Sequence, residues 1–426
     1  MSPRDGGDAW CPAFSRRQEK APAVSQIEGP GCHARSCVTA HVALWTCGGR
    51  QVGLEFYLRP PDVSAQRSAD GTAPQNESDH IKRAVLPTRL GWMRFLLLLI
   101  IALTHLYTMS VPQVSRRVVQ KVFAAEQSDG VGVRLRRAIG NRQLRNLTPF
   151  LMLDHFTITP GSGFADHPHR GQTTVTYMFD GFVEHEDFAG HRGVIGPGDI
   201  QWMCVGRGMV HAEMPKHKDD NGNPLPNPVG MQLWLDLPKS AKYVEPSYQE
   251  LRSAEMPHQH PRDTEPAETE GKGWEIKIIA GRSHGGESPV KWPQGAGCWF
   301  MDIKLDPQGW VFQELPNGWN TILYLVGGTV TVGDKDAEYN QYDTLVLTTP
   351  SDVNGQDGVR ITNPTDKPAR VILISGEPMK DRVVQYGPFV LNSEEEVYKA
   401  IEDYQLGKNG FERAPHWQSE IAKGFR

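Results

Sequence analysis

Two pairs of potential metal ligands most constrain what this chain can fold into. His167 and His169 stand two residues apart, and His211 and Glu213 repeat that spacing further along the chain. In a β-strand, side chains two residues apart point to the same face of the sheet. Two adjacent strands of a small barrel would therefore bring three imidazoles and a carboxylate to one point. Such a set of ligands suits a redox-active divalent metal that keeps open coordination positions.

The sequence between the two pairs favours strands joined by tight turns. Residues 173–179 are rich in β-branched and aromatic side chains, and Gly181 follows as a turn signal. Residues 196–199 mark a second turn, and residues 200–205 read as another strand. We therefore expect both pairs to lie on strands of one antiparallel barrel. The second pair matters most, because a lone His-x-His is more often a polar rim feature than a metal site.

Four further histidines lie near these pairs but lack a same-face partner at strand spacing. We interpret them as surface or rim residues rather than ligands. They are His155, His185, His191 and His217.

Composition indicates a globular all-β protein with an acidic body. The chain is 38% hydrophobic and 22% charged, and its 43 glycines and 32 prolines suit many turns between short strands. Residues 1–108 carry 12 Lys and Arg against 9 Asp and Glu, whereas the remainder carries 33 against 41. An acidic body is a poor nonspecific partner for nucleic acid, so we expect no direct nucleic-acid binding.

The cysteines favour a reducing compartment. Only Cys204 and Cys298 of the six cysteines fall in the body of the chain, which is too few for a disulfide framework. The four earlier cysteines lack a C-x-x-C pair, so a zinc site among them is a weaker alternative.

The first 111 residues do not read as part of a barrel. Residues 1–91 are rich in Gly, Pro, Ser and charge, and we expect disorder, although residues 41–58 could pair as two strands. Residues 92–111 contain the apolar run 93–109, whose unbroken core is too short for a standard transmembrane helix. Three interpretations remain open: an internal signal or anchor, a helix packed on the body, or a natural start further along at Met93 or Met109.

The remaining chain divides into four expected segments. Residues 112–245 form a first, metal-binding barrel, and residues 246–272 form a polar linker loop. Residues 273–385 form a second barrel, and residues 386–426 supply a short helix and a tail. The predicted fold is therefore all-β, with two tandem antiparallel β-barrels and a short C-terminal helix.

An internal repeat indicates that the second barrel lacks the ligands. Residues 324–330 align with residues 177–183, and this alignment puts Glu314 and Pro316 in the places of the two paired histidines. No His-x-Glu pair follows the second repeat. We expect the second barrel to be a structural partner of the first.

The expected C-terminal helix has clear boundaries. Ser393 and Glu396 form a capping-box pattern, Val397 and Ile401 follow at helical spacing, and Gly407 ends the run.

A series of long motifs in a fixed order resembles the pirin family, whose members are bicupins. The resemblance spans roughly residues 112–426. The motifs are QSDGVGVRLRRAIG (127–140), HPHRG (167–171), HEDFAGH (185–191), PGDIQWM (197–203), GRGMVHAEMP (206–215), MQLW (231–234), GPFVLN (387–392) and KNGFERA (408–414).

The resemblance implies an iron(II) centre with His167, His169, His211 and Glu213 as ligands. The ligand types alone also allow manganese, nickel, copper or zinc. Many cupins place a glutamate four or five residues after the His-x-His pair, where this chain has threonines. The carboxylate must therefore come from Glu213, as in the pirin pattern.

Two functions follow from the resemblance. One is a quercetin 2,3-dioxygenase, in which a flavonol gives a proton to Glu213, the catalytic base, and reacts with O2 to release CO. The other is a nuclear redox-sensing transcription cofactor that binds a transcription factor or another regulatory protein. For this second function, Arg134, Arg136 and Arg137 match the family's basic patch. We expect a monomer in cytoplasm and nucleus, or an endomembrane or secreted protein if residues 93–109 act as a signal.

Overall fold

The computed structural model describes most of the chain beyond residue 112. The described residues are 40–47, 50–58, 113–129, 132–262, 271–292, 297–350 and 356–423. The chain divides into two units, Met1–Leu90 and Gly91–Arg426.

In the first unit, β1 (Ala40–Cys47) pairs antiparallel with β2 (Arg50–Leu58), so the strand pair allowed by residues 41–58 is present. The apolar run 93–109 lies outside the described residues. In the part of the chain that is described, no helix is long and apolar enough to cross a bilayer.

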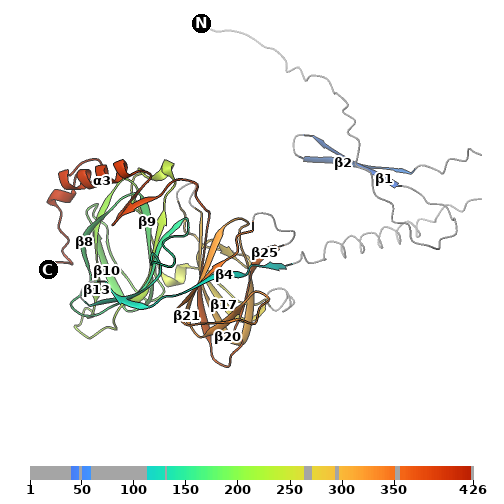
Figure 1. Cartoon of the computed structure of the whole chain (residues 1–426), viewed down its shortest axis with the longest axis horizontal. Coiled ribbons are helices and arrows are strands. Elements are labelled where there is room, and N and C mark those ends of the chain that lie inside the picture. Colours follow the sequence, from blue (N-terminus) through green and yellow to red (C-terminus); the bar gives the residue numbers. More distant parts are fainter. Residues whose placement is uncertain are drawn as a thin grey trace, which may run out of the picture. The chain divides into compact units, whose positions relative to one another are not determined.

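The first barrel of the second unit consists of two antiparallel sheets that curve around one space (Figure 1). The four-stranded sheet has the order β11 (Arg192–Ile195), β10 (Phe182–Asp187), β13 (Met209–Lys216), β8 (Phe164–His169). The seven-stranded sheet has the order β15 (Ser247–Leu251), β12 (Ile200–Cys204), β9 (Gln172–Asp180), β14 (Val229–Asp236), β7 (Phe150–Ile158), β6 (Val133–Ile139), β5 (Glu126–Ser128).

The second barrel is a single eleven-stranded sheet. Its main path runs β23 (Glu338–Asn340), β22 (Thr329–Val332), β25 (Gln356–Thr362), β20 (Cys298–Glu314), β26 (Ala369–Gly376), β21 (Asn320–Gly327), β24 (Asp343–Leu347), β4 (Val118–Phe123), and β3 (Gln113–Ser115), β16 (His258–Gln259) and β17 (Gly271–Ala280) attach beside it. The predicted all-β fold with two barrels is confirmed.

Short elements complete the second unit. Two hairpins and three 3-10 turns connect the barrels' strands and the C-terminal tail. They are β18 (Arg282–Ser283) with β19 (Gly286–Glu287), β27 (Val384–Tyr386) with β28 (Phe389–Leu391), η1 (Lys239–Ala241), η2 (Ser253–Glu255) and η3 (Ala414–His416).

An apolar core joins the two barrels. The central strand β9 has both faces buried, because its inner face lines the first barrel and its outer face packs on the second. Val175 and Tyr177 lie in one buried cluster with Phe300 and Ile322 of the second barrel. Tyr177 also donates a hydrogen bond of 2.7 Å to Asp302, which anchors the polar edge of this contact.

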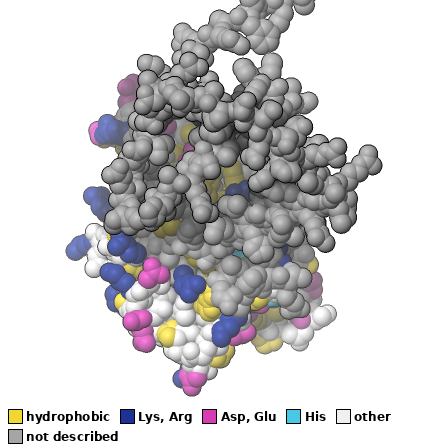
Figure 2. Space-filling model, turned by 90° about the vertical axis from the view of Figure 1, so that its right-hand side faces the viewer, with side chains coloured by type: hydrophobic (Ala, Val, Ile, Leu, Met, Phe, Trp, Pro, Cys, Tyr) yellow, Lys and Arg dark blue, Asp and Glu magenta, His cyan; other side chains and the backbone are white. Residues whose placement is uncertain are grey.

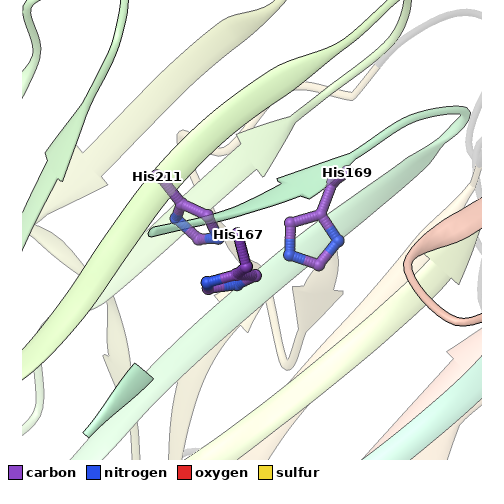
Figure 3. Close-up of side chains that lie close together, drawn as sticks. All are labelled: His167, His169 and His211. Atoms are coloured by element: carbon purple, nitrogen blue, oxygen red, sulfur yellow. The ribbon is translucent and has the colours of Figure 1, made fainter. Parts of the chain in front are cut away.

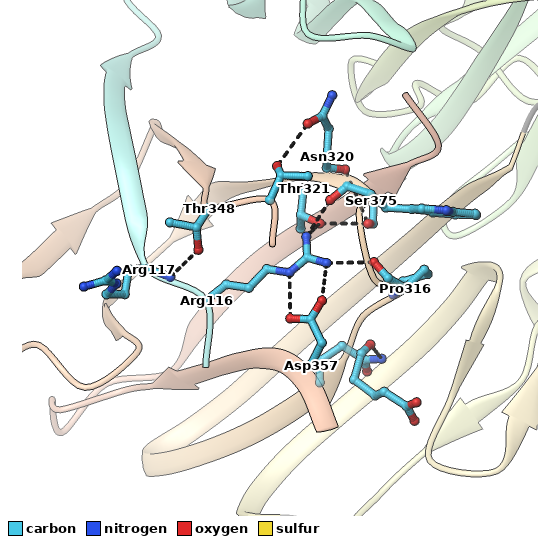
Figure 4. A network of polar contacts seen from close by, with 12 residues as sticks. Arg116, Arg117, Pro316, Asn320, Thr321, Thr348, Asp357 and Ser375 are labelled. Atoms are coloured by element: carbon cyan, nitrogen blue, oxygen red, sulfur yellow. Dashed lines mark hydrogen bonds and ion pairs between the residues drawn. The ribbon is translucent and has the colours of Figure 1, made fainter. Parts of the chain in front are cut away.

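The first strands after residue 112 belong to the second barrel. The sequence had predicted that residue 112 begins the first barrel. β3 pairs in parallel with β25, and β4 pairs antiparallel with β24. Between these two strands lies Arg116, which is buried at 2% exposure (Figure 4). Its guanidinium donates to both carboxylate oxygens of Asp357, at 3.0 and 2.6 Å, and to the backbone oxygen of Pro316, at 2.7 Å. These buried contacts tie the segment to the second barrel.

The expected linker also differs from the structure. Its first residues form β15, an edge strand that pairs with β12, and residues 263–270 lie outside the described part.

The predicted C-terminal helix is present as α3 (Glu394–Leu406). The Ser393 side chain accepts from the Glu396 backbone at 3.2 Å, and Gly407 ends the helix with a φ of 63°. Val397 and Ala400 are buried in an apolar cluster with β28.

Acidic and basic side chains are interspersed among the described residues on the face drawn in Figure 2.

Candidate metal centre

Strand register brings the three predicted histidines together. β8 pairs with β13 so that His167 lies opposite His211 and His169 lies opposite Met209. Pro168, between the two histidines, is tolerated because β8 is an edge strand of its sheet. The same-face argument from the sequence is therefore realised in the pairing of these two strands.

The three imidazoles converge on one point (Figure 3). One ring nitrogen from each of His167, His169 and His211 lies within 4.8 Å of the others. The ring centroids are 4.9, 4.4 and 5.1 Å apart, and Trp234 packs edge-to-face on His169 at 5.1 Å. His211 is fully buried, whereas His167 is half-buried and faces the barrel opening.

Hydrogen bonds at Nδ1 orient two of the rings. The Nδ1 of His167 donates to the backbone oxygen of Ala165 at 2.8 Å. The Nδ1 of His169 lies 2.7 Å from the side-chain amide of Gln172. Such outer partners orient imidazole ligands in metal proteins.

The surroundings of the third imidazole, that of His211, indicate whether a metal fits this site. Both ring nitrogens of His211 are buried, and neither has a hydrogen-bond partner among the described residues. An unpaired buried polar atom is destabilising by about 1–3 kcal/mol. A metal bond at one of these nitrogens would satisfy that atom, and the convergence of the three imidazoles therefore fits a metal.

Burial sets the protonation state that metal binding needs. It lowers the pKa of His169 and of His211 well below the usual value, and the neighbouring imidazoles lower it further. Both rings are therefore neutral at pH 7, which is the form that binds a metal.

Glu213 lies in the same barrel interior but outside the close group of nitrogens. A bulge in the β8–β13 pairing falls between His211 and Glu213. The carboxylate is 5% exposed and accepts hydrogen bonds from Thr176, at 3.0 Å, and from Gln232, at 3.2 Å. Its role as a fourth ligand or as a base stays a prediction.

Two connected cavities surround the histidines. An inner cavity of about 120 Å³ lies inside the barrel, and it is lined by Glu213, by the charged side chains of Asp129, Arg137 and Asp154, and by several apolar side chains. A groove of about 1330 Å³ lies at the barrel mouth. His167, His169 and Trp234 line both, so the groove is the entrance to the candidate centre.

One of the four histidines interpreted as surface or rim residues is buried, and a second lies between the two barrels. His185 is 1% exposed and pairs with the carboxylate of Glu250. It points inward because β10 alternates, with Val183 and Asp187 on the same buried face. His155 is half-buried at the contact between the barrels, and its Nδ1 lies 3.0 Å from the Tyr324 hydroxyl.

The other two match the interpretation more closely. The His191 side chain is 51% exposed and pairs with Asp187, and His217 is half-buried in the loop after β13.

The arginines of the predicted partner patch are charge-paired. Arg134 and Arg136 both bind Glu126, at 2.7 and 3.1 Å. Arg137 donates two hydrogen bonds to the buried carboxylate of Asp154, at 2.9 and 2.8 Å, and lines the groove.

Comparison with known proteins agrees with this architecture. The family model for pirin matches residues 132–235, and that for the pirin C-terminal cupin domain matches residues 300–410. Pirin-like protein 2 of Arabidopsis thaliana is 41% identical over 312 residues, which cover 72% of this chain and 89% of that protein. Human pirin is 41% identical over 310 residues, which cover 72% of this chain and 98% of that protein.

Solved structures share the fold. A structure named GK1651 from Geobacillus kaustophilus is 29% identical, with a TM-score of 0.55, over 64% of this chain and 100% of that chain. A structure named quercetin 2,3-dioxygenase from Acinetobacter baumannii is 24% identical, with a TM-score of 0.59, over 70% and 99%. With both halves of the family matched and the histidine triad in the first barrel, this chain belongs to the pirin family of the cupin superfamily.

Proposed function

We propose that this protein is a metal-dependent dioxygenase of the quercetin 2,3-dioxygenase type, which cleaves a flavonol with O2 and releases CO. The observation that carries the proposal is His211, whose two buried nitrogens lack partners beside two oriented imidazoles and an open cavity. The Acinetobacter protein's name suggests the reaction class, while the similarity to it is one of fold.

The proposed ligands are His167, His169, His211 and Glu213, and the proposed metal is iron(II). Manganese, nickel, copper and zinc remain alternatives, because the same nitrogen and oxygen ligands accept them. When bound, iron(II) would supply open positions for dioxygen and for the substrate's oxygens.

Glu213 is the proposed proton acceptor for the flavonol 3-hydroxyl. Thr176 and Gln232 hold its carboxylate by donating hydrogen bonds at 3.0 and 3.2 Å. These donors fix the direction of the carboxylate, which suits a base that must meet one proton of a bound substrate. Neither donor is acidic, so the carboxylate stays available for that proton.

Five further residues that line the inner cavity are apolar. They come from strands β6, β7, β8 and β10 and present apolar side chains to the space beside Glu213. These residues are Leu135, Phe156, Ile158, Phe164 and Val183. A flat aromatic ligand suits walls of this kind.

The test is CO release from quercetin by the full-length chain, loaded with iron(II) under anaerobic conditions and then exposed to O2. We expect CO in proportion to bound iron and its loss in His169→Ala. His416→Ala is the matched control, because His416 is exposed and outside the triad. Turnover that persists in His169→Ala would remove the assignment.

The alternative function, a redox-sensing transcription cofactor in cytoplasm and nucleus, uses the same centre. Its proposed contact has less support, because Arg134 and Arg136 are paired with Glu126. It predicts a partner affinity that changes between the ferrous and ferric protein and falls in Arg134→Glu. Binding that is independent of the oxidation state would exclude it.

A further inference from the structure

The groove at the mouth of the first barrel is strongly basic. Four arginines line it, Arg137, Arg142, Arg145 and Arg382, and no Asp or Glu of the described ranges does. This basic lining differs from the acidic balance of the folded body of the chain. The groove opens directly onto His167 and His169, so its charge acts on whatever enters the candidate centre.

Two of these arginines have no carboxylate to neutralise them. Arg137 is paired with Asp154, and Arg382 lies 3.1 Å from Glu394. Arg142 and Arg145, in contrast, are exposed and make no hydrogen bond or ion pair with another residue in the described ranges. Two unpaired guanidinium groups three residues apart in the sequence can bind an oxyanion.

The loop that carries Arg142 and Arg145 is held in shape. Asn141 accepts hydrogen bonds from the backbone of Gln143 and Leu144, at 2.8 and 2.9 Å. Its amide donates back to the carbonyl of Arg137 at 2.8 Å. The backbone of the two arginines is thus ordered before a ligand arrives, which lowers the entropy cost of binding.

The inner cavity is too small to hold a typical ligand, so part of the ligand must lie in the groove. The inner cavity of about 120 Å³ is smaller than the 300 Å³ or so that a drug-sized ligand typically fills. A two- or three-ring molecule that touches the triad must therefore extend into the groove. Its outer end then lies in the groove that Arg142 and Arg145 line.

We infer that the groove recognises an anionic group, a carboxylate or a phosphate, on the outer end of an aromatic ligand whose inner end reaches the metal centre. The inference rests on the proposed function for its inner end only. The charge selects for acidic aromatic substrates over neutral ones. Arg142 and Arg145 are the specificity residues, and they contact the substrate away from the reacting atoms.

The experiment is calorimetric titration of the full-length iron(II) protein under argon. Benzoate and phenyl phosphate are the two anionic probes, and benzyl alcohol is the neutral one. We expect both anions to bind more tightly than the alcohol, and we expect Arg142→Gln/Arg145→Gln to weaken the preferred anion roughly tenfold. The stronger of the two anions identifies carboxylate or phosphate as the recognised group.

Arg192→Gln is the matched control, because Arg192 is exposed and lines neither cavity. The charge-preserving variant Arg142→Lys/Arg145→Lys should keep most of the anion affinity. Equal affinity of the wild type for benzyl alcohol and for both anions would overturn the inference. Anion binding that the double glutamine variant retains would also overturn it, because the anion would then bind the metal.

The same wild-type preparation is assayed for CO release from quercetin. CO release without anion binding would support the proposed reaction and refute the proposed anion site. Arginine-dependent anion binding without CO release would support the proposed anion site and refute the proposed reaction.

Discussion

Replacing Arg116 with methionine should strongly destabilise the second barrel. The Arg116 and Asp357 side chains are 1% and 5% exposed, and the guanidinium donates to both oxygens of that carboxylate. It also donates to the backbone oxygens of Trp319 and Pro316, at 2.5 and 2.7 Å. In Arg116→Met these acceptors lose their donor in a place that water does not reach (Figure 4).

The expected loss is about 3–5 kcal/mol, the range for removing one partner of a buried ion pair. Removing the orphaned charge as well, in Arg116→Met/Asp357→Leu, should recover most of it, since an apolar pair of similar volume is often near neutral. At a urea dependence of about 3 kcal/mol per molar, the single variant should unfold at a urea concentration roughly 1–1.7 M lower.

Urea unfolding followed by circular dichroism measures this shift. Arg117→Met is the control, because the neighbouring Arg117 is exposed and only its backbone bonds, to Thr348. We expect the control to change stability by less than about 0.5 kcal/mol. A loss below about 1 kcal/mol in Arg116→Met would refute the reasoning.

Three further predictions concern titration, the candidate base and the surface. Burial, with the charges of Arg136 and Arg370, lowers the pKa of His155 to about 4. The unfolded state then binds more protons below pH 6.5 or so, and stability falls by about 3 kcal/mol toward pH 4. Urea unfolding of His155→Gln, measured as a function of pH, should lack the fall in stability that protonation of His155 causes. A pH profile equal to that of the wild type would contradict this prediction. Gln232→Ala, which removes a donor to the candidate base, should lower kcat for CO release roughly tenfold with little change in KM; an unaltered kcat would count against the positioning role. Arg134→Glu should shift stability by under about 1 kcal/mol in thermal unfolding, because its ion pair is exposed, and a larger loss would show that the pair is structural.

Local periodicity was enough to predict part of the histidine triad. The i, i+2 spacing puts His167 and His169 on one face whatever the rest of the barrel does. Only the register of β8 against β13 then decides whether His211 joins them, and the structure pairs it with His167. The helix α3 was equally predictable, because its cap and its stop are both local signals.

Features that depend on distant segments were not predictable. The partner of His185, Glu250, comes from a strand that the sequence suggested was a loop, so the pairing of this buried histidine was not foreseen. Arg116 is 241 residues from Asp357, so nothing near it in sequence indicates its burial. The basic groove combines the loop after β6 with the hairpin before α3, and single stretches do not reveal such a surface.

The central claim is that His167, His169 and His211 hold a metal. Iron content and X-ray absorption of the full-length chain, reconstituted anaerobically with iron(II), test it most directly. The account predicts one iron per chain with three imidazoles around it, and loss of that iron in His211→Ala but not in His416→Ala. Equal iron content and an equal imidazole signal in the wild type and in His211→Ala would contradict it.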